Sequence, residues 1–135
     1  MKNSAFVDTF FLIALLETSD AHHERARALS KSLGKTKLLT TDAVLIELGN
    51  YFARSSLRAE AIEWIRAIRA HAEWEVVPLD AALMARGEDR YRRYSDKSWS
   101  LTDCISMEVM KQGGLREVAT SDGHFTQAGF HILIK

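Results

Sequence analysis

Two kinds of apolar pattern follow one another along the chain. Short apolar segments, which are typical of strands, occupy residues 4–7, 37–40, 74–79, 117–120 and 131–134. Between most of them, apolar residues recur three and four positions apart, as they do along one face of an amphipathic helix. This spacing predicts helices over residues 9–16, 21–33, 43–54, 57–72, 81–94 and 101–112.

Capping residues support the ends of these helices. Asp20, Thr41-Asp42 and Asp80 each precede a predicted helix, and their side chains can accept hydrogen bonds from its free N–H groups. The pair Gly113-Gly114 follows the last long helix, at a position where the chain commonly turns into the left-handed region. The boundaries of the elements are therefore consistent with the apolar pattern.

The alternation of strands and helices predicts an α/β fold. Strands separated by helices of about ten or more residues need crossover connections, which are right-handed and give a mainly parallel sheet. Helices cover both faces of such a sheet, so we expect a three-layer sandwich around four or five strands. Without repeats, linkers or low-complexity segments, the 135 residues predict one domain over 1–135.

Composition places this domain in a reducing compartment. Cys104, the single cysteine, lies in an apolar segment and cannot form an internal disulfide, which favours the cytoplasm. The apolar run 10–16 is followed by the polar residues 17–20, where a signal peptide would need a small-residue cleavage site. No apolar stretch approaches the ~20 residues of a membrane-spanning helix, so no membrane association is expected.

Charge is informative through its distribution, because 18 basic and 18 acidic residues cancel. Basic side chains gather in two groups, while several acids lie among apolar residues. Basic surfaces around an acidic pocket suit a metal-dependent enzyme that acts on a polyanion, although solvated helix faces also explain them. The two groups are Arg54, Arg58, Arg66 and Arg69, and Arg86, Arg90, Arg92, Arg93 and Lys97.

Four acids are expected to meet at one edge of the sheet. Ligands of parallel sheets bind beyond the carboxyl ends of the strands, where loops and helix N-termini converge. Asp8 ends the first strand, and Asp122 follows the fourth. Glu47 lies in the second turn of the helix after the second strand, and Asp103 lies in the first turn of the helix 101–112.

Each acid also has a structural explanation. Asp8 can cap the helix that begins at residue 9, and Asp103 completes a capping box with Ser100. Asp122 belongs to an Asp-Gly turn, and Glu47 can belong to a solvated helix face. Independent caps and turns nevertheless give no reason for four carboxylates to share one edge.

A divalent cation reconciles these acids with their surroundings. The helix around Asp103 is apolar on nearly all sides, so an unpaired carboxylate there is costly, and clustered acids repel one another. Oxygen ligands without cysteine or adjacent histidine favour Mg²⁺, or Mn²⁺, over zinc. Such an ion suits phosphodiester hydrolysis. His124 can reach a phosphate, but a helix or turn position is the simpler reading.

At these residues the chain resembles the PIN-domain family, in particular its single-domain bacterial kind, the VapC toxins. The resemblance lies in the segments FVDTFFLIALL, TTDAVLIELGNYF, WSLTDCISMEVMKQ and VATSDGHFTQAGF, and spans nearly the whole chain. It implies that the four acids bind magnesium, that Thr9 and Thr120 support the site, and that activated water cleaves RNA. It also implies a homodimer and a cognate antitoxin, as in a type II toxin–antitoxin pair.

Other readings are weaker. A response-regulator receiver needs an acidic neighbour beside Asp8, and a haloacid-dehalogenase phosphatase needs an aspartate where the chain has Phe10. A PIN fold that serves as an inactive binding or scaffold module remains an alternative, as does a housekeeping RNA-processing nuclease without an antitoxin. The sequence does not identify the RNA, because no base-reading motif is visible.

Overall fold

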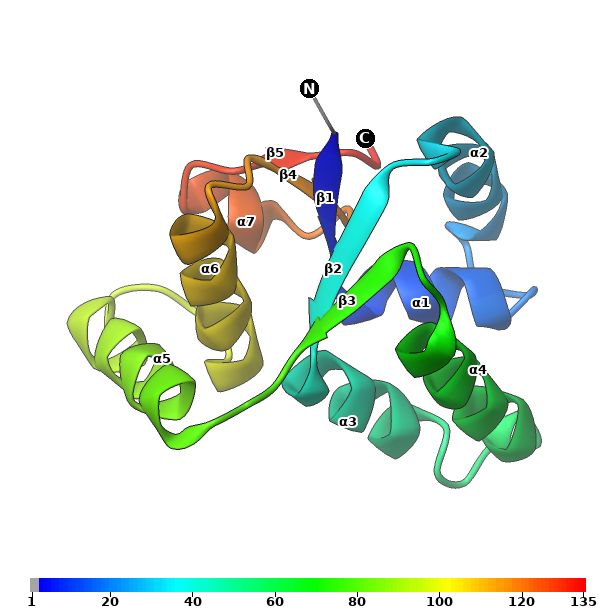
Figure 1. The fold of residues 1–135 in the computed structure, drawn as a ribbon, viewed down its shortest axis with the longest axis horizontal. Coiled ribbons are helices and arrows are strands. Elements are labelled where there is room, and N and C mark those ends of the chain that lie inside the picture. Colours follow the sequence, from blue (N-terminus) through cyan, green and yellow to red (C-terminus); the bar gives the residue numbers. More distant parts are fainter. Residues whose placement is uncertain (1–2) are drawn as a thin grey trace.

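A central parallel sheet organises the structure, a computed structural model that describes residues 3–135 (Figure 1). Its strand order is β3-β2-β1-β4-β5, and every neighbouring pair is parallel. The predicted α/β class and mainly parallel sheet are therefore confirmed. The strands are β1 Ser4–Val7, β2 Lys37–Thr41, β3 Trp74–Val77, β4 Glu117–Ala119 and β5 His131–Ile132.

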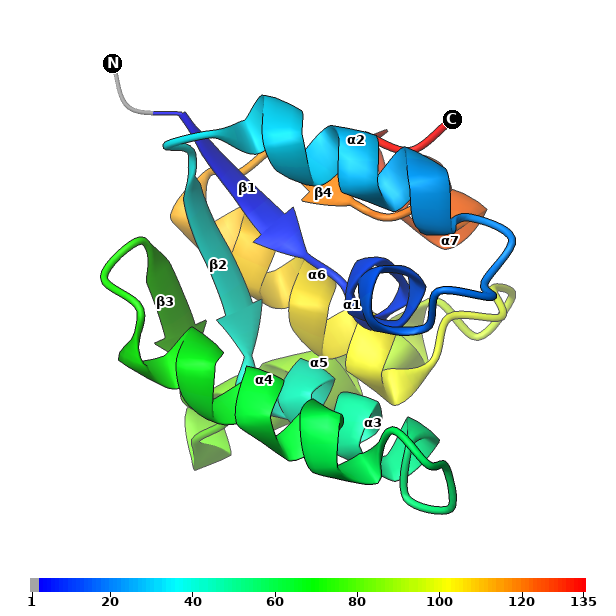
Figure 2. The same ribbon diagram turned by 90° about the vertical axis from the view of Figure 1, so that its right-hand side faces the viewer.

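Helices cover both faces of the sheet, as expected for three layers (Figures 1 and 2). Figure 1 shows α6 and α7 on one side of the sheet and α1, α2 and α4 on the other, with α5 packed on the outside of α6. Within residues 3–135 the helices are α1 Thr9–Leu16, α2 His23–Leu33, α3 Asp42–Tyr51, α4 Arg58–Ala70, α5 Ala81–Arg93, α6 Leu101–Gly113 and α7 Gly123–Gln127.

The core lies between the sheet and these helices. Phe6 and Val118 on neighbouring strands, Leu48 on α3 and Met107 on α6 are all fully buried. Burial on both faces explains why the strands read as short apolar segments rather than as alternating ones. None of the helices in the described part of the chain is both long and apolar enough to cross a membrane.

Several helix ends follow the predicted caps. Thr41 and Asp80 accept hydrogen bonds from Val44 N–H at 3.1 Å and Leu83 N–H at 2.8 Å, and Gly114 adopts φ 67° after α6. The cap expected at Asp20 is wrong: its carboxylate accepts from His22 N–H at 2.8 Å, and α2 begins only at His23. A local turn competes with the helix for that aspartate.

The short helix α7 was not predicted. The sequence there suggested a turn at Asp122-Gly123, whereas the chain continues from it into a helical segment. Five residues give too few turns to show the three-and-four spacing. α7 begins at the same edge of the sheet as the end of β4, so it contributes side chains to that edge.

Close packing of α5 against α6 fixes the position of α6. A side chain at Gly87 would place its Cβ 2.5 Å from Ile105 Cγ1. One turn further, Arg90 Nε donates to Glu108 Oε2 at 2.7 Å, and both residues are only 7% exposed. The buried ion pair and the glycine contact together set the distance between the two helices.

Gly87→Ala is expected to destabilise the protein by about 1–2 kcal/mol, because the new methyl group meets a β-branched side chain that is stiff about χ1. Gly49→Ala is the matched control, since its Cβ would lie 3.8 Å from Ile65 Cδ1, an ordinary contact. Alanine favours helix by about 1 kcal/mol over glycine, so the control should be neutral or stabilising. Chemical denaturation measures both; equal effects would contradict the packing argument.

Candidate metal centre

The site lies at the carboxyl ends of β1 and β4, where the strand order reverses. β2 and β3 extend the sheet on one side of β1, and β4 and β5 extend it on the other. Ligands of open α/β sheets bind at such a switch point. Val7 pairs with Ala119, so the next residues, Asp8 and Thr120, are neighbours: Thr120 Oγ1 donates to Asp8 Oδ2 at 2.9 Å.

Asp8 does not act as a helix cap. It occupies the N-cap position of α1, but its side chain makes no capping hydrogen bond. The residue is 5% exposed, and its hydrogen bond from Thr120 comes from the opposite side of the switch point. The expectation that Asp8 simply caps α1 is therefore wrong, and helix capping does not explain its buried carboxylate.

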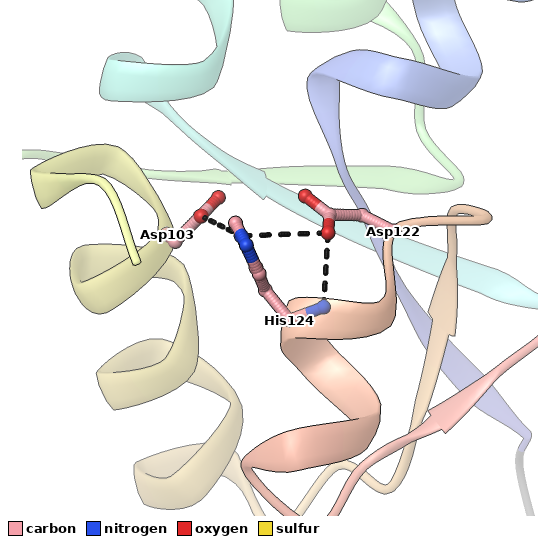
Figure 3. Close-up of side chains that lie close together, drawn as sticks. All are labelled: Asp103, Asp122 and His124. Carbon is pink, nitrogen blue, oxygen red and sulfur yellow. Dashed lines mark hydrogen bonds and ion pairs between the residues drawn. The ribbon is translucent and has the colours of Figure 1, made fainter. Parts of the chain in front are cut away.

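Asp103 serves both the helix and the site. It completes the predicted capping box, since Ser100 Oγ accepts from Asp103 N–H at 2.9 Å and Asp103 Oδ2 accepts from Ser100 N–H at 3.1 Å. The same Oδ2 lies 3.2 Å from Nδ1 of His124. The cap holds one carboxylate oxygen in a fixed direction at the start of α6, facing α7 (Figure 3).

Asp122 and His124 come from the start of α7. Asp122 Oδ1 accepts from His124 N–H at 2.9 Å and lies 3.4 Å from His124 Nδ1. Asp122 N–H in turn donates to Thr120 Oγ1 at 3.1 Å. The Thr120 hydroxyl thus connects Asp8 and Asp122, the acids that follow the two strands.

One atom each from Asp103, Asp122 and His124 lies within 4.8 Å of the other two, a spacing that a single metal ion can bridge (Figure 3). The histidine was not among the site residues expected from the sequence, where it was read as a helix or turn position. Its spacing two residues after Asp122 is the only signal that could have found it. His124 therefore offers a nitrogen donor beside the carboxylate oxygens on which the expectation of Mg²⁺ or Mn²⁺ rests.

Burial first, and then the negative charges of Asp103 and Asp122, raise the pKa of Asp8 from 3.8 to about 7, against the hydrogen bonds from Thr120 and the Thr9 backbone. A nearby cation favours the ionised form of Asp8, so the group of acids suits a hard divalent ion.

Glu47 lies one contact away from this cluster. It is exposed on α3, and its Oε1 accepts a hydrogen bond from Thr9 Oγ1. Thr9 directly follows Asp8, so it connects the second turn of α3 to the switch point. The structure thus brings Asp103 and Asp122 together with His124 and places Asp8 near enough for the charges of both acids to raise its pKa. It holds Glu47 at their margin through Thr9, the threonine that was expected to support the site.

Comparison with known proteins agrees with this architecture. The family model described as PIN domain matches residues 5–131. The 23S rRNA-specific endonuclease VapC20 of Mycobacterium tuberculosis is 30% identical over 125 residues, which cover 93% of this chain and 94% of that protein. The crystal structure of VapC20, a Sarcin-Ricin loop cleaving toxin, superimposes with a TM-score of 0.86, 29% identity and coverage of 93% and 95%.

More distant structures share the fold. FitAcB from Neisseria gonorrhoeae gives a TM-score of 0.67 at 20% identity, with 95% of both chains covered. DNA-bound VapBC from Salmonella typhimurium gives 0.62 at 17% identity, with 98% of this chain and 97% of that chain covered. With the match of the family model over nearly all of its length, the chain belongs to the PIN domain family.

Proposed function

We propose that this protein is a metal-dependent endoribonuclease that hydrolyses RNA phosphodiesters, with Asp8, Glu47, Asp103 and Asp122 as its functional acids. The observation that carries this proposal is the buried Asp8 carboxyl, whose pKa is raised to about 7 by burial and by the charges of Asp103 and Asp122. Such an arrangement is costly unless a cation neutralises it. Membership of the PIN family and the endonuclease activity of VapC20 support the same reaction class.

The residues divide the work between binding and orientation. Asp8, Asp103 and Asp122 would hold the ion, with His124 as a further donor and Glu47 beside them. A bound Mg²⁺ or Mn²⁺ supplies charge stabilisation at the phosphate and a more acidic water. Thr120 orients Asp8, Ser100 orients Asp103, and Thr9 orients Glu47 through the hydrogen bonds described above. These outer hydrogen bonds fix the direction of each carboxylate before the substrate binds.

The protein is proposed to act as one nuclease domain and as the toxin of a type II toxin–antitoxin pair in the cytoplasm. VapC20 is named as a toxin, and the FitAcB and VapBC structures share the fold of this chain. A cognate antitoxin and a homodimer are accordingly the expected partners. Growth arrest on expression, relieved by the product of a neighbouring small reading frame, would support the toxin role; normal growth and intact RNA would contradict it.

Removal of divalent ions is expected to abolish RNA cleavage. Purified protein without any partner is incubated with labelled single-stranded RNA and with ribosomal RNA, in Mg²⁺, in Mn²⁺ and in excess EDTA. Without an ion, nothing offsets the repulsion between the carboxylates and the negatively charged phosphate of the RNA. Cleavage products should therefore appear only with Mg²⁺ or Mn²⁺, and cleavage should return when the ion is restored after EDTA.

Cleavage that persists undiminished in EDTA would contradict the metal mechanism. Absence of cleavage with every ion and RNA tested would favour the inactive binding module instead. Stable RNA binding by the same preparation would then separate a scaffold from a misfolded sample.

A further inference from the structure

A cleft of about 660 Å³ lies between the end of α5 and the start of α6. Tyr91, Lys97 and Ser100 contribute to its lining. Ser100 is the residue whose N–H donates to Asp103 Oδ2, so one wall of the cleft is also the support of a proposed metal ligand. Most of the lining belongs to the loop that joins α5 to α6, whose course can be followed in Figure 1.

A buried tryptophan and a ring contact hold the frame of the cleft. Trp99 is 5% exposed, and its Nε1 donates to Gln127 Oε1 on α7 at 3.0 Å. The Tyr94 ring packs on Trp99 with centroids 4.9 Å apart. The guanidinium group of Arg93 lies 5.5 Å from the centre of the Tyr94 ring. The rings of Tyr94 and Trp99 therefore pack within the protein and support the loop. The cleft is present without a ligand, so less order has to be gained on binding.

Among the aromatic rings described here, Tyr91 makes no ring contact or hydrogen bond of this kind within residues 3–135. Its side chain is 54% exposed, among the highest values of the large apolar residues in the described part of the chain. A single exposed tyrosine is ordinary. Tyr91 shares its cleft with the basic side chains of Arg92 and Lys97 and with Ser100, which supports a proposed metal ligand. Aromatic rings and basic side chains together are the groups with which proteins bind unpaired bases.

The cleft is locally basic although the chain as a whole is neutral. Arg92 and Arg93 both pair with the single carboxylate of Asp89, so the two guanidinium groups leave a positive charge uncompensated. Lys97 pairs with Asp96 at the surface, where the bond is weak and exchangeable. Cations at the end of α5 also favour the helix dipole, but this does not explain why they surround an exposed ring.

We propose that this cleft binds single-stranded RNA next to the scissile phosphate, with a nucleobase stacked on Tyr91 and the backbone phosphates contacted by Arg92 and Lys97. The inference rests on the proposed nuclease function and adds a binding subsite to it. Its volume lies within the range of roughly 300–1,000 Å³ that suits a small-molecule ligand, and an unpaired base offers the face that stacking requires. Tyr91 contacts the substrate here and takes no part in the chemical step.

Binding to catalytically disabled protein tests the subsite without any cleavage. Asp8→Asn protein, free of divalent ions, is titrated into a fluorescein-labelled single-stranded RNA of about a dozen nucleotides, and anisotropy gives the Kd at several salt concentrations. Adding Tyr91→Ala should weaken binding about fivefold or more, whereas Tyr91→Trp should retain it, because either ring can stack on a base. Lys97→Ala should lower the slope of log K against log salt by about 0.7.

Tyr51→Ala is the matched control, because Tyr51 on α3 is 53% exposed and lies outside the cleft lining. It should bind RNA like its parent, and thermal unfolding should show that all variants are folded. Irradiation of an RNA that carries 5-iodouridine should give an adduct on Tyr91, located by mass spectrometry.

The outcomes separate the two proposals. Unchanged binding by Tyr91→Ala, with adducts confined to other surfaces, overturns the subsite and leaves the nuclease function standing. Equal losses for Tyr91→Ala and Tyr51→Ala also overturn it. Absence of RNA binding in every variant overturns the subsite together with the RNA substrate class.

Discussion

Asp103→Asn is expected to lower the single-turnover rate of RNA cleavage by more than about a hundredfold while the protein stays folded. Substitution of a residue that merely supports a metal ligand already costs about 10–100-fold, and this change would remove the charge of a ligand itself. Asparagine keeps an oxygen that can accept from Ser100 N–H, so the cap at the start of α6 survives. Rates are measured at saturating Mg²⁺, with thermal unfolding as the test of the fold.

Asp80→Asn is the control for this prediction. Asp80 caps α5 through Leu83 N–H at 2.8 Å, as Asp103 shares in capping α6, but it lies outside the acidic cluster. Its variant should retain cleavage close to that of the unmodified protein. If Asp103→Asn also kept more than a third of the rate, Asp103 would be a helix cap and nothing more.

The stability of the metal-free protein should fall as the pH rises from about 4 to about 7. Burial first, and then the charges of Asp103 and Asp122, raise the pKa of Asp8 from 3.8 to about 7. In this window the unfolded chain loses the proton that the folded protein retains, so the free energy of unfolding drops with pH. The slope is about 1.4 kcal/mol per pH unit, a total on the order of a few kcal/mol, with a plateau above the folded pKa.

Asp8→Asn should remove this slope. At pH 8 without divalent ions the variant should be more stable than the unmodified protein, because the amide carries no charge to bury. Mg²⁺ should stabilise the unmodified protein at pH 8 and have little effect on the variant. Urea denaturation at several pH values measures each of these free energies.

Asp42→Asn provides a control of opposite sign. Burial raises the pKa of Asp42, but the hydrogen bonds from Arg69 and from Leu79 N–H outweigh it and hold that pKa below its usual value. A carboxyl whose pKa is lowered in the folded protein contributes stability at pH values above its pKa in the unfolded chain. This stability is lost as the pH falls through the folded pKa. Asp42→Asn should therefore be destabilising at neutral pH. If both Asp8→Asn and Asp42→Asn lowered the stability at pH 8, the result would contradict the cost that we assign to burying the charged Asp8 carboxylate.

The predictable parts of the site are those that local chemistry sets. Asp103 was expected in a capping box with Ser100, and this motif is present because its hydrogen bonds join residues three positions apart. The position of Asp8 after the first strand follows from the apolar segment that ends at Val7. His124 was not expected in the cluster, because α7 is too short to show a helical period and its imidazole faces Asp103 from another part of the chain.

The sequence by itself determined the order of the strands and of the six longer helices, the parallel sheet and the acids at its carboxyl edge. Periodicity and capping suffice for this because they act between residues a few positions apart. Only the tertiary structure decided that β4 lies beside β1, which places Thr120 against Asp8 and buries that carboxyl, and the burial raises its pKa. It also decided that Glu47 reaches the site through Thr9. Which strands become neighbours depends on burial summed over the whole core, and this sum has no counterpart in any short stretch of sequence.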